Sequence, residues 1–277
     1  MSRKLQKFLV LLDNETLLYF PGSFLSGKVV VELDEEIPVT GLYFHIVGEG
    51  VVRLTDKSKV NTSDRENYID FRMRLLGENT PKGSPARVVF LSPGVHSFPF
   101  KLGLPLGLPS TFLGKHGWVQ YFCKAALKEP SGLTHKNQQV FIVMSPIDLN
   151  LEPNLLTTIQ YTAKNKVVQA ETRELAFLEK GRIEAGTTDQ WRNEMLYIPP
   201  IPPTNLRGCH LIRIQYDVYF IISPKGPGKE IRLQLPIMMA TYPIRNSDGT
   251  LQRKKGTHYP TVLPVFRPWL NTDKFKT

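Results

Sequence analysis

A proline-rich corner leading into a long strand occurs twice in this chain and limits what it can fold into. Residues 104–127 read LPLGLPSTFLGKHGWVQYFCKAAL, where prolines and glycines fix or free the backbone before a stretch of period-two alternation. The alternation predicts a half-buried strand that begins at Trp118. One face of this strand is formed by Val119, Tyr121, Cys123, Ala125 and Leu127, and the other by Gln120 and Lys124.

The second copy of this pattern starts 94 residues later, in the stretch IPPIPPTNLRGCHLIRIQYDVYFII at residues 198–222. Read side by side, the two copies match at four positions, with one extra residue between the glycine and the tyrosine of the second copy. The matches are Pro203, Thr204, Gly208 and Tyr216 with Pro109, Ser110, Gly114 and Tyr121. Such self-similarity predicts two related β-rich halves.

Proline content supports an all-β fold. The chain has 22 prolines in 277 residues, which is above the typical share of about 5%. Because proline is poorly tolerated inside helices and central strands, this composition favours many short strands joined by corners. At this length the chain forms one large or two medium domains, each able to bury a core.

The first half shows the alternation of an antiparallel β-sandwich. Inward-facing side chains are expected at Leu42, Phe44 and Ile46, and again at His96, Phe98, Phe100 and Leu102. Strands are predicted at 8–12, 17–20, 28–33, 39–52, 68–76, 88–91, 94–102, 118–127 and 138–144, with loops at 54–67, 77–85 and 129–136.

The second half gives fewer strands, after a linker over 145–153. Its strongest pattern is 210–222, joined by a turn to 229–241 as a hairpin. Further strands are predicted at 158–163, 167–180 and 191–198. Residues 171–180 fit either a strand or a helix, because Leu175 and Leu178 also have helical spacing.

Motifs of catalytic or metal chemistry are absent from the sequence. It contains no Gly-Lys-Ser/Thr phosphate loop, no Gly-x-Gly-x-x-Gly, no His-Glu-x-x-His and no Cys-x-x-Cys. Cys123 and Cys209 are predicted to be reduced thiols, since two cysteines make no disulfide framework. His45 and His96 lie within strands and are expected to be structural. These features predict a protein that is not an enzyme and has no metal or other cofactor.

Basic residues are the candidate binding residues. Lysine and arginine exceed aspartate and glutamate by ten, which favours acidic partners. Around two loops of the first half lie Lys57, Lys59, Arg72, Arg74, Lys82 and Arg87. They form either an ordinary solvated face or a surface for phosphorylated cargo or acidic lipids, to which arginine brings paired donors. Aromatic residues do not interleave with these charges, which argues against nucleic acid.

Two sets of residues resemble the arrestin family, and its arrestin domain-containing (α-arrestin) branch most closely, over residues 6–245. The first resembles an arrestin N-domain: Pro99-Phe100, Leu108-Pro109-Ser110-Thr111-Phe112, Gly114, Gly117 and Tyr121. The second resembles the later half of a C-domain: Trp191, Ile198-Pro199-Pro200, Pro202-Pro203-Thr204, Gly208-Cys209, Leu211-Ile212, Tyr216 and Leu235-Pro236-Ile237.

This resemblance implies a fold and a function. The fold would be two arrestin-like antiparallel β-sandwiches at 6–146 and 158–245, separated by a linker at 147–157 and followed by a tail at 246–277. The function would be a non-catalytic adaptor that links membrane-protein cargo to endocytic, vesicular trafficking or ubiquitination machinery. The alternative is a structural subunit of a retromer-like endosomal coat. No segment has the roughly 20 apolar residues of a membrane span, so we expect a cytoplasmic protein, peripherally at the plasma membrane or endosomes.

Two departures from the family pattern add expectations. Residues 151–245 hold only four or five predicted strands, so the second sandwich is expected to be incomplete and marginally stable. The Pro-Pro pairs at 199–200 and 202–203 are not followed by the tyrosine of a Pro-Pro-x-Tyr motif, which many α-arrestins use to bind WW domains. The chain is therefore expected to reach ubiquitin ligases, if at all, through other arrestins.

Overall fold

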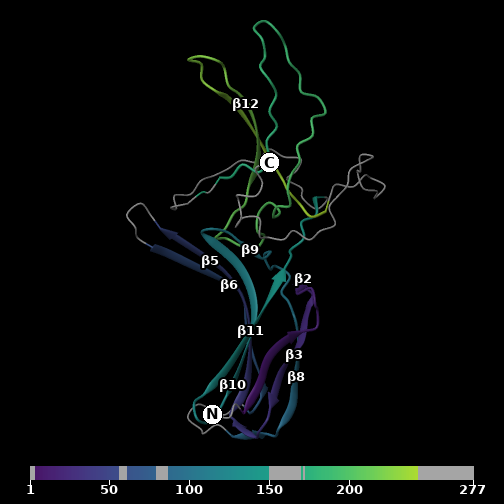
Figure 1. Cartoon of the computed structure of the whole chain (residues 1–277), viewed down its shortest axis with the longest axis vertical. Helices are drawn as coiled ribbons and strands as arrows, with labels where there is room; N and C mark the ends of the chain where they lie inside the picture. Colours follow the sequence, from purple (N-terminus) through teal and green to yellow (C-terminus); the bar gives the residue numbers. More distant parts are fainter. Residues whose placement is uncertain (1–3, 56–60, 79–86, 150–169, 171, 243–277) are drawn as a thin grey trace, which may run out of the picture.

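The structure, a computed structural model, describes residues 4–55, 61–78, 87–149, 170 and 172–242, and all its regular elements are strands (Figure 1). The first half forms two facing sheets. A three-stranded sheet has the order β1-β3-β8, and a longer one has the order β2-β11-β10-β5-β6, with β9 beside β10 and a separate β4–β7 pair. The strands are β1 (Leu5–Leu12), β2 (Leu18–Tyr19), β3 (Phe24–Leu33), β4 (Ile37–Val39), β5 (Gly41–Thr55), β6 (Asn61–Leu76), β7 (Val89–Leu91), β8 (Gly94–Gly103), β9 (Phe112–Leu113), β10 (Gly117–Lys128) and β11 (Thr134–Val143).

The hydrophobic core lies between these two sheets, as the alternation predicted. The five inward residues of β10 are at most 1% exposed, and they face buried valines of β3 such as Val29 and Val31. Phe44 of β5 stacks on Phe100 of β8 with ring centroids 4.0 Å apart, which ties one sheet to the other. Each large side chain buried in this way stabilises the fold by about 1.5–3 kcal/mol.

Two predicted loops of the first half contain strand residues. The predicted loop 54–67 is wrong for its described residues, because β5 continues to Thr55 and β6 begins at Asn61. Residues 56–60 lie outside the described residues. The predicted loop 129–136 is also too long, because β11 begins at Thr134. In β6 the residues at 62–66 are all polar, a composition that is typical of loops. A strand end that is exposed on both faces shows no alternation, so periodicity did not reveal it.

The corner that precedes each long strand has the same hydrogen bonds in both halves. The Tyr121 hydroxyl donates to the Pro109 carbonyl at 2.6 Å, and the Tyr216 hydroxyl donates to the Pro202 carbonyl at 2.7 Å. Burial raises the pKa of both tyrosines. These bonds show that Pro202, not Pro203, is the counterpart of Pro109. The pairing predicted from sequence was therefore wrong by one position at the proline.

A threonine two residues after the corner proline completes the repeat. The backbone N–H of Thr111 donates to the Val143 carbonyl, and its hydroxyl accepts from the Val143 N–H at 2.9 Å. Thr204 makes the same two bonds with Met239, the second at 2.7 Å. Thr204 is thus the counterpart of Thr111 rather than of Ser110. The predicted internal repeat is confirmed, with two extra residues between the corner and the tyrosine.

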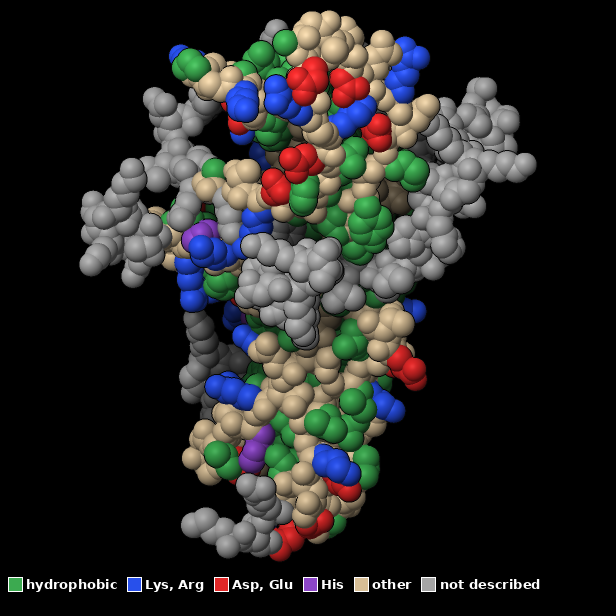
Figure 2. Space-filling view, turned by 45° about the horizontal axis from the view of Figure 1, so that its top comes forward, with side chains coloured by type: hydrophobic (Ala, Val, Ile, Leu, Met, Phe, Trp, Pro, Cys, Tyr) green, Lys and Arg blue, Asp and Glu red, His purple; other side chains and the backbone are tan. Residues whose placement is uncertain are grey.

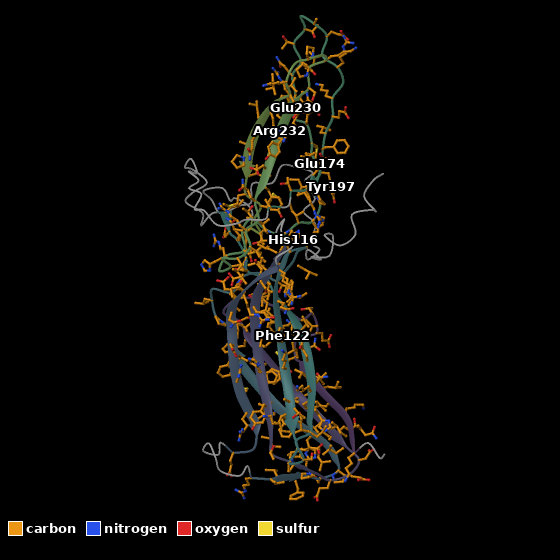
Figure 3. All side chains as sticks on the ribbon, turned by 90° about the vertical axis from the view of Figure 1, so that its left-hand side faces the viewer. His116, Phe122, Glu174, Tyr197, Glu230 and Arg232 are labelled. Carbon is orange, nitrogen blue, oxygen red and sulfur yellow. The ribbon has the colours of Figure 1, made fainter. Side chains whose placement is uncertain are left out.

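The second half contains one two-stranded ribbon among the described residues, β12 (Tyr216–Ile222) and β13 (Ile231–Ile237). Figure 3 shows Glu230 and Arg232 on this ribbon, far from Phe122 in the first sandwich, with His116 between them. The predicted hairpin is confirmed with shorter strands. Residues 172–180 and 191–198 have no regular structure, so the strands predicted there, and the helix considered for 171–180, are wrong for these residues. The predicted strand 158–163 lies outside the described residues.

One face of the ribbon is wholly apolar. Cross-strand pairs place Val218 opposite Leu235, Phe220 opposite Leu233 and Ile222 opposite Ile231 on the face that also carries Tyr216. The matching face of β10 is the core face of the first sandwich. Here the six paired side chains remain 38–63% exposed, although Tyr216 is buried, and Trp191 packs edge-on against Phe220 with ring centroids 5.7 Å apart. An isolated pair of strands needs further strands beside it and a layer of side chains over its apolar face to be stable. Among the described residues of the second half, no third strand pairs with the ribbon and most of its apolar face is exposed.

The two halves meet where the second corner packs against the first. Leu206 is buried in the core cluster of the first sandwich, and Cys209 packs against it. Gly208 has φ +86°, and a Cβ at this position would lie 2.3 Å from the Gly107 carbonyl oxygen. Only glycine therefore fits this left-handed position.

A polar contact adds to this docking. The backbone N–H of His210 donates to Glu66 Oε2 at 3.0 Å, and the His210 ring pairs with the other oxygen of the same carboxylate. Partial burial raises the pKa of Glu66, but the hydrogen bonds from His210 and Tyr68 outweigh it and hold that pKa below its ordinary value. The carboxylate thus joins β6 to the second half.

Candidate anion-binding face

The structure describes three of the six basic residues singled out from the sequence. Lys57, Lys59 and Lys82 lie outside the described residues. Arg87 precedes β7 and pairs with Glu78 at 2.9 Å, so a carboxylate already occupies it. Arg72 and Arg74 both lie on β6 and point to the outer face of the long sheet, away from the core. These two arginines are the part of the predicted set on which a site can be built.

Strand register extends this pair into a larger cluster. Tyr43 is paired with Arg74 and His45 with Arg72 across β5 and β6. On the other side of β5, Tyr43 is paired with Ala126 and His45 with Lys124. Directly paired residues share a face of the sheet, and alternate residues along a strand share it too. We call the resulting outer surface the basic face: Arg72 and Arg74 of β6, Tyr43 and His45 of β5, Lys124 and Lys128 of β10, and Lys136 of β11.

Tyr43 holds two of these cations in place. The Arg74 guanidinium lies 4.7 Å from the centre of the Tyr43 ring, and one of its nitrogens donates to the Tyr43 hydroxyl at 2.7 Å. The Lys128 ammonium lies 4.7 Å from the same ring centre. Such cation–π contacts attract and orient a cation without neutralising its charge. Two positive charges are thus fixed around one aromatic ring and stay available to an anion.

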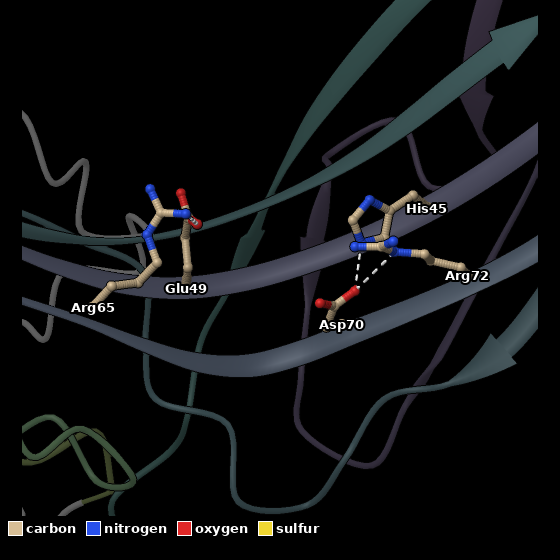
Figure 4. Close-up of polar contacts among 5 residues, drawn as sticks. All are labelled: His45, Glu49, Arg65, Asp70 and Arg72. Atoms are coloured by element: carbon tan, nitrogen blue, oxygen red, sulfur yellow. Dashed lines mark hydrogen bonds and ion pairs between the residues drawn. The ribbon is translucent and has the colours of Figure 1, made fainter.

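A second contact group lies one pair further along the strands (Figure 4). Asp70 accepts from the His45 ring at 2.6 Å and pairs with Arg72 at 3.3 Å. The hydrogen bond from His45, helped by the Arg72 charge, lowers the pKa of Asp70. Figure 4 also shows Glu49 with Arg65, further along the same two strands. Asp70 therefore offsets part of the positive charge at one end of the basic face.

The shape of the basic face suits an extended ligand. Tyr43, His45, Arg72 and Arg74 border a shallow surface hollow together with Phe44 and Met73. Lys124 lies exposed beside it, with its ammonium 4.4 Å from the centre of the Phe122 ring. Several cations along a shallow, open surface fit a chain of anionic groups better than one small molecule, which needs a deep enclosing pocket. The arrangement offers charge-assisted hydrogen bonds and no nucleophile placed beside a base.

Three cations of this face were absent from the predicted set. The sequence predicted that Lys124 lies on the outward face of its strand. It did not predict that Lys124 and Arg72 flank the same residue of β5, His45. Lys128 ends β10, one residue past the predicted strand, and Lys136 lies near the start of β11, within the predicted loop 129–136. The order of the strands in the sheet brings these residues together.

Other features of the described residues bear on chemistry. Across these ranges, no three histidine, cysteine, aspartate or glutamate side chains gather as metal ligands would. The described part of the chain also contains no helix that is long and apolar enough to cross a membrane. Cys123 and Cys209 are both free thiols, as predicted. Burial raises the pKa of the Cys123 thiol to about 12, which keeps it protonated and unreactive.

The rest of the surface has mixed character. In Figure 2, hydrophobic side chains reach the surface in both halves, between lysines, arginines and acidic residues. At the far end of the second half, Arg232 pairs with Glu230 at 3.2 Å. Lys180 and Asp189 form a second ion pair in the second half, at 3.0 Å. The basic face differs from these regions because its cations outnumber the acidic side chain beside them.

Comparison with known proteins agrees with this fold. The family model of the arrestin (or S-antigen) N-terminal domain matches residues 8–150, and that of the C-terminal domain matches residues 150–244. Arrestin domain-containing protein 4 of Mus musculus is 26% identical over 304 residues, covering 85% of this chain and 71% of that protein. Arrestin domain-containing protein 17 of Caenorhabditis elegans is 23% identical and covers 87% of this chain and 71% of that protein.

Two further similarities were found. Thioredoxin-interacting protein of Homo sapiens is 23% identical and covers 87% of this chain and 76% of that protein. Among solved structures, the sporulation control protein Spo0M from Bacillus subtilis is 18% identical, with a TM-score of 0.35 over 50% of this chain and 48% of that chain.

The aligned region of the mouse relative is longer than the part of this chain that matches it. The 304 aligned positions with the mouse protein take in 85% of 277 residues, which is about 235. The relative therefore has about 70 residues inside the aligned region for which this chain has no counterpart. The matching family models and the two corner repeats nevertheless extend over both halves. This chain belongs to the arrestin family, in its arrestin domain-containing (α-arrestin) branch.

Proposed function

We propose that this chain is a non-catalytic adaptor that binds acidic or phosphorylated segments of membrane-protein cargo on the basic face of its first sandwich. The observation that carries the proposal is the gathering of four cations on one face: Arg74 and Lys128 contact Tyr43, and Arg72 and Lys124 flank the neighbouring His45. Paired arginine donors suit carboxylate and phosphate oxygens. The membership of the family supports an adaptor role in general, and the basic face supplies the surface for it.

The proposal extends to the place and partners of this adaptor. It acts in the cytoplasm, peripherally at the plasma membrane or endosomes, where cytoplasmic tails of membrane proteins are accessible. It delivers cargo to endocytic or vesicular trafficking machinery, and it reaches ubiquitin ligases through other arrestins. Stable co-purification with a fixed endosomal coat, rather than with varied cargo, would instead support the retromer-like alternative.

Reversing two charges of the basic face tests the proposal. We expect Arg72→Glu combined with Arg74→Glu to weaken binding of fluorescein-labelled polyglutamate by at least about tenfold, because two charge-assisted contacts become repulsive. Fluorescence anisotropy with the full chain, at low and at raised salt, measures the effect. Binding by the natural chain should fall as salt rises.

The matched control is Lys225→Glu combined with Arg232→Glu. This variant makes the same change of net charge on the ribbon of the second half, far from the basic face. It should bind polyglutamate nearly as tightly as the natural chain. Equal weakening by both double variants would show that overall charge, and not the basic face, holds the anion. Thermal unfolding of both variants checks that they remain folded.

A further inference from the structure

The strand β6 forms an open edge of the long sheet. In the strand order β2-β11-β10-β5-β6 it is the last strand, paired along its length with β5. Among the described residues no strand pairs with its other side. An edge of this kind presents unpaired backbone N–H and C=O groups, which other chains can use as a template.

The side chains along residues 69–76 differ between the two faces of this edge. On the outer face lie Arg72 and Arg74, which belong to the basic face. On the inner face lie Phe71 and Met73. Phe71 is 45% exposed, whereas Ile69 on the same face is only 6% exposed. The inner face therefore ends, at the edge, in apolar surface that nothing in the described structure covers fully.

We propose that β6 accepts an extended segment of the cargo as an additional strand, and that this segment alternates acidic and apolar side chains. The backbone of the segment pairs with the open edge of β6. Its acidic side chains point to the outer face and reach Arg72 and Arg74, while its apolar side chains cover Phe71 and Met73. This inference rests on the proposed function and adds to it the conformation and the sequence pattern of the cargo.

The charged outer face and the apolar inner face of this edge together favour a segment in which acidic and apolar residues alternate. A purely acidic segment leaves Phe71 exposed and places half of its charges over apolar surface. A purely apolar segment brings no anionic group to Arg72 and Arg74. Alternation with period two satisfies both faces at once, because successive side chains of a strand point to opposite faces. The anionic groups are carboxylates or phosphates, which share the chemistry that arginine recognises.

Three labelled peptides test this inference on the full chain. The first alternates leucine and glutamate and is long enough to span residues 69–76. The second has the same composition with all leucines before all glutamates. The third has the sequence of the first with every backbone amide N-methylated, which removes the donors for strand pairing. We expect the second and third peptides to bind at least about tenfold more weakly than the first, because each lacks one part of the match.

Two variants place the binding on β6. Phe71→Asp should weaken binding of the alternating peptide by about tenfold, because it puts a negative charge where an apolar side chain has to lie. Phe90→Asp is the control, since Phe90 is also exposed but lies on β7. Replacing glutamate by phosphoserine in the alternating peptide distinguishes the two sources of anion, and the tighter of the two peptides identifies which one the edge prefers.

The outcomes separate this inference from the proposed function. If the three peptides bind equally well and Arg72→Glu with Arg74→Glu still abolishes binding, the basic face binds anions without strand addition and the inference is wrong. If the peptides bind equally well to that double variant, or if none of them binds, the proposed function fails as well. The proposed function and the strand-addition inference are both supported if the alternating peptide binds most tightly, and if this preference is lost in Phe71→Asp and kept in Phe90→Asp.

Discussion

Alanine in place of Gly208 is expected to detach the second half of the molecule from the first sandwich. The substitution forces a side chain into a left-handed conformation at φ +86° and puts its Cβ within 2.3 Å of the Gly107 carbonyl oxygen. Strain of this kind costs about 1–3 kcal/mol before the clash is counted. We expect limited proteolysis to cut residues 172–242 at least about tenfold faster, while the first sandwich stays intact.

Gly226→Ala is the matched control for this result. Gly226 also has a positive φ, +110°, but nothing lies within 4 Å of the position that its Cβ would take. This variant carries local backbone strain in the turn of the ribbon without touching the contact between the halves. If both alanine variants are cut equally fast, the packing of Gly208 on Gly107 does not hold the halves together.

Phenylalanine in place of Tyr121 should lower the free energy of unfolding by about 2 kcal/mol. The change keeps the ring but removes the hydroxyl that donates to Pro109, and so leaves a buried carbonyl without this donor. Chemical denaturation of the full chain measures the loss.

Tyr197→Phe supplies the control for that measurement. It removes the same hydroxyl from a side chain that is 81% exposed, so it should change stability very little. A Tyr121→Phe variant as stable as the control would mean that the corner hydrogen bond contributes nothing to the fold of the first half.

The strands of the first half could be predicted from sequence where the two faces of a strand differ in polarity. In β10, Val119 and Tyr121 lie inward while Gln120 and Lys124 lie outward, and this contrast predicted both the strand and its buried face. The start of β6 escaped prediction because its residues are polar on both faces. The counterpart of Pro109 was misplaced by one residue, since either of two adjacent prolines fits the pattern, and the hydrogen bonds of Tyr216 and Thr204 distinguish them.

The second half and the basic face were harder to predict for a different reason. Residues 191–198 have strand-like composition, but a strand forms only when neighbours pair with it, and periodicity carries no information about neighbours. The same limit applies to Lys124 and Lys128, which meet Arg72 and Arg74 only through the order of β6, β5 and β10. Sequence showed that Arg72, Arg74 and Lys124 were basic and outward, and the sheet order showed that they share one face with Lys128.

Hydrogen–deuterium exchange of the full chain, with and without the alternating leucine–glutamate peptide, shows which backbone amides the peptide protects. We expect slower exchange in β6 over residues 69–76, whose open-edge amides gain partners, with smaller effects in β5 and β10. The β12–β13 ribbon should exchange as before. Protection confined to the ribbon, or spread evenly over the chain, would contradict a binding site on the basic face.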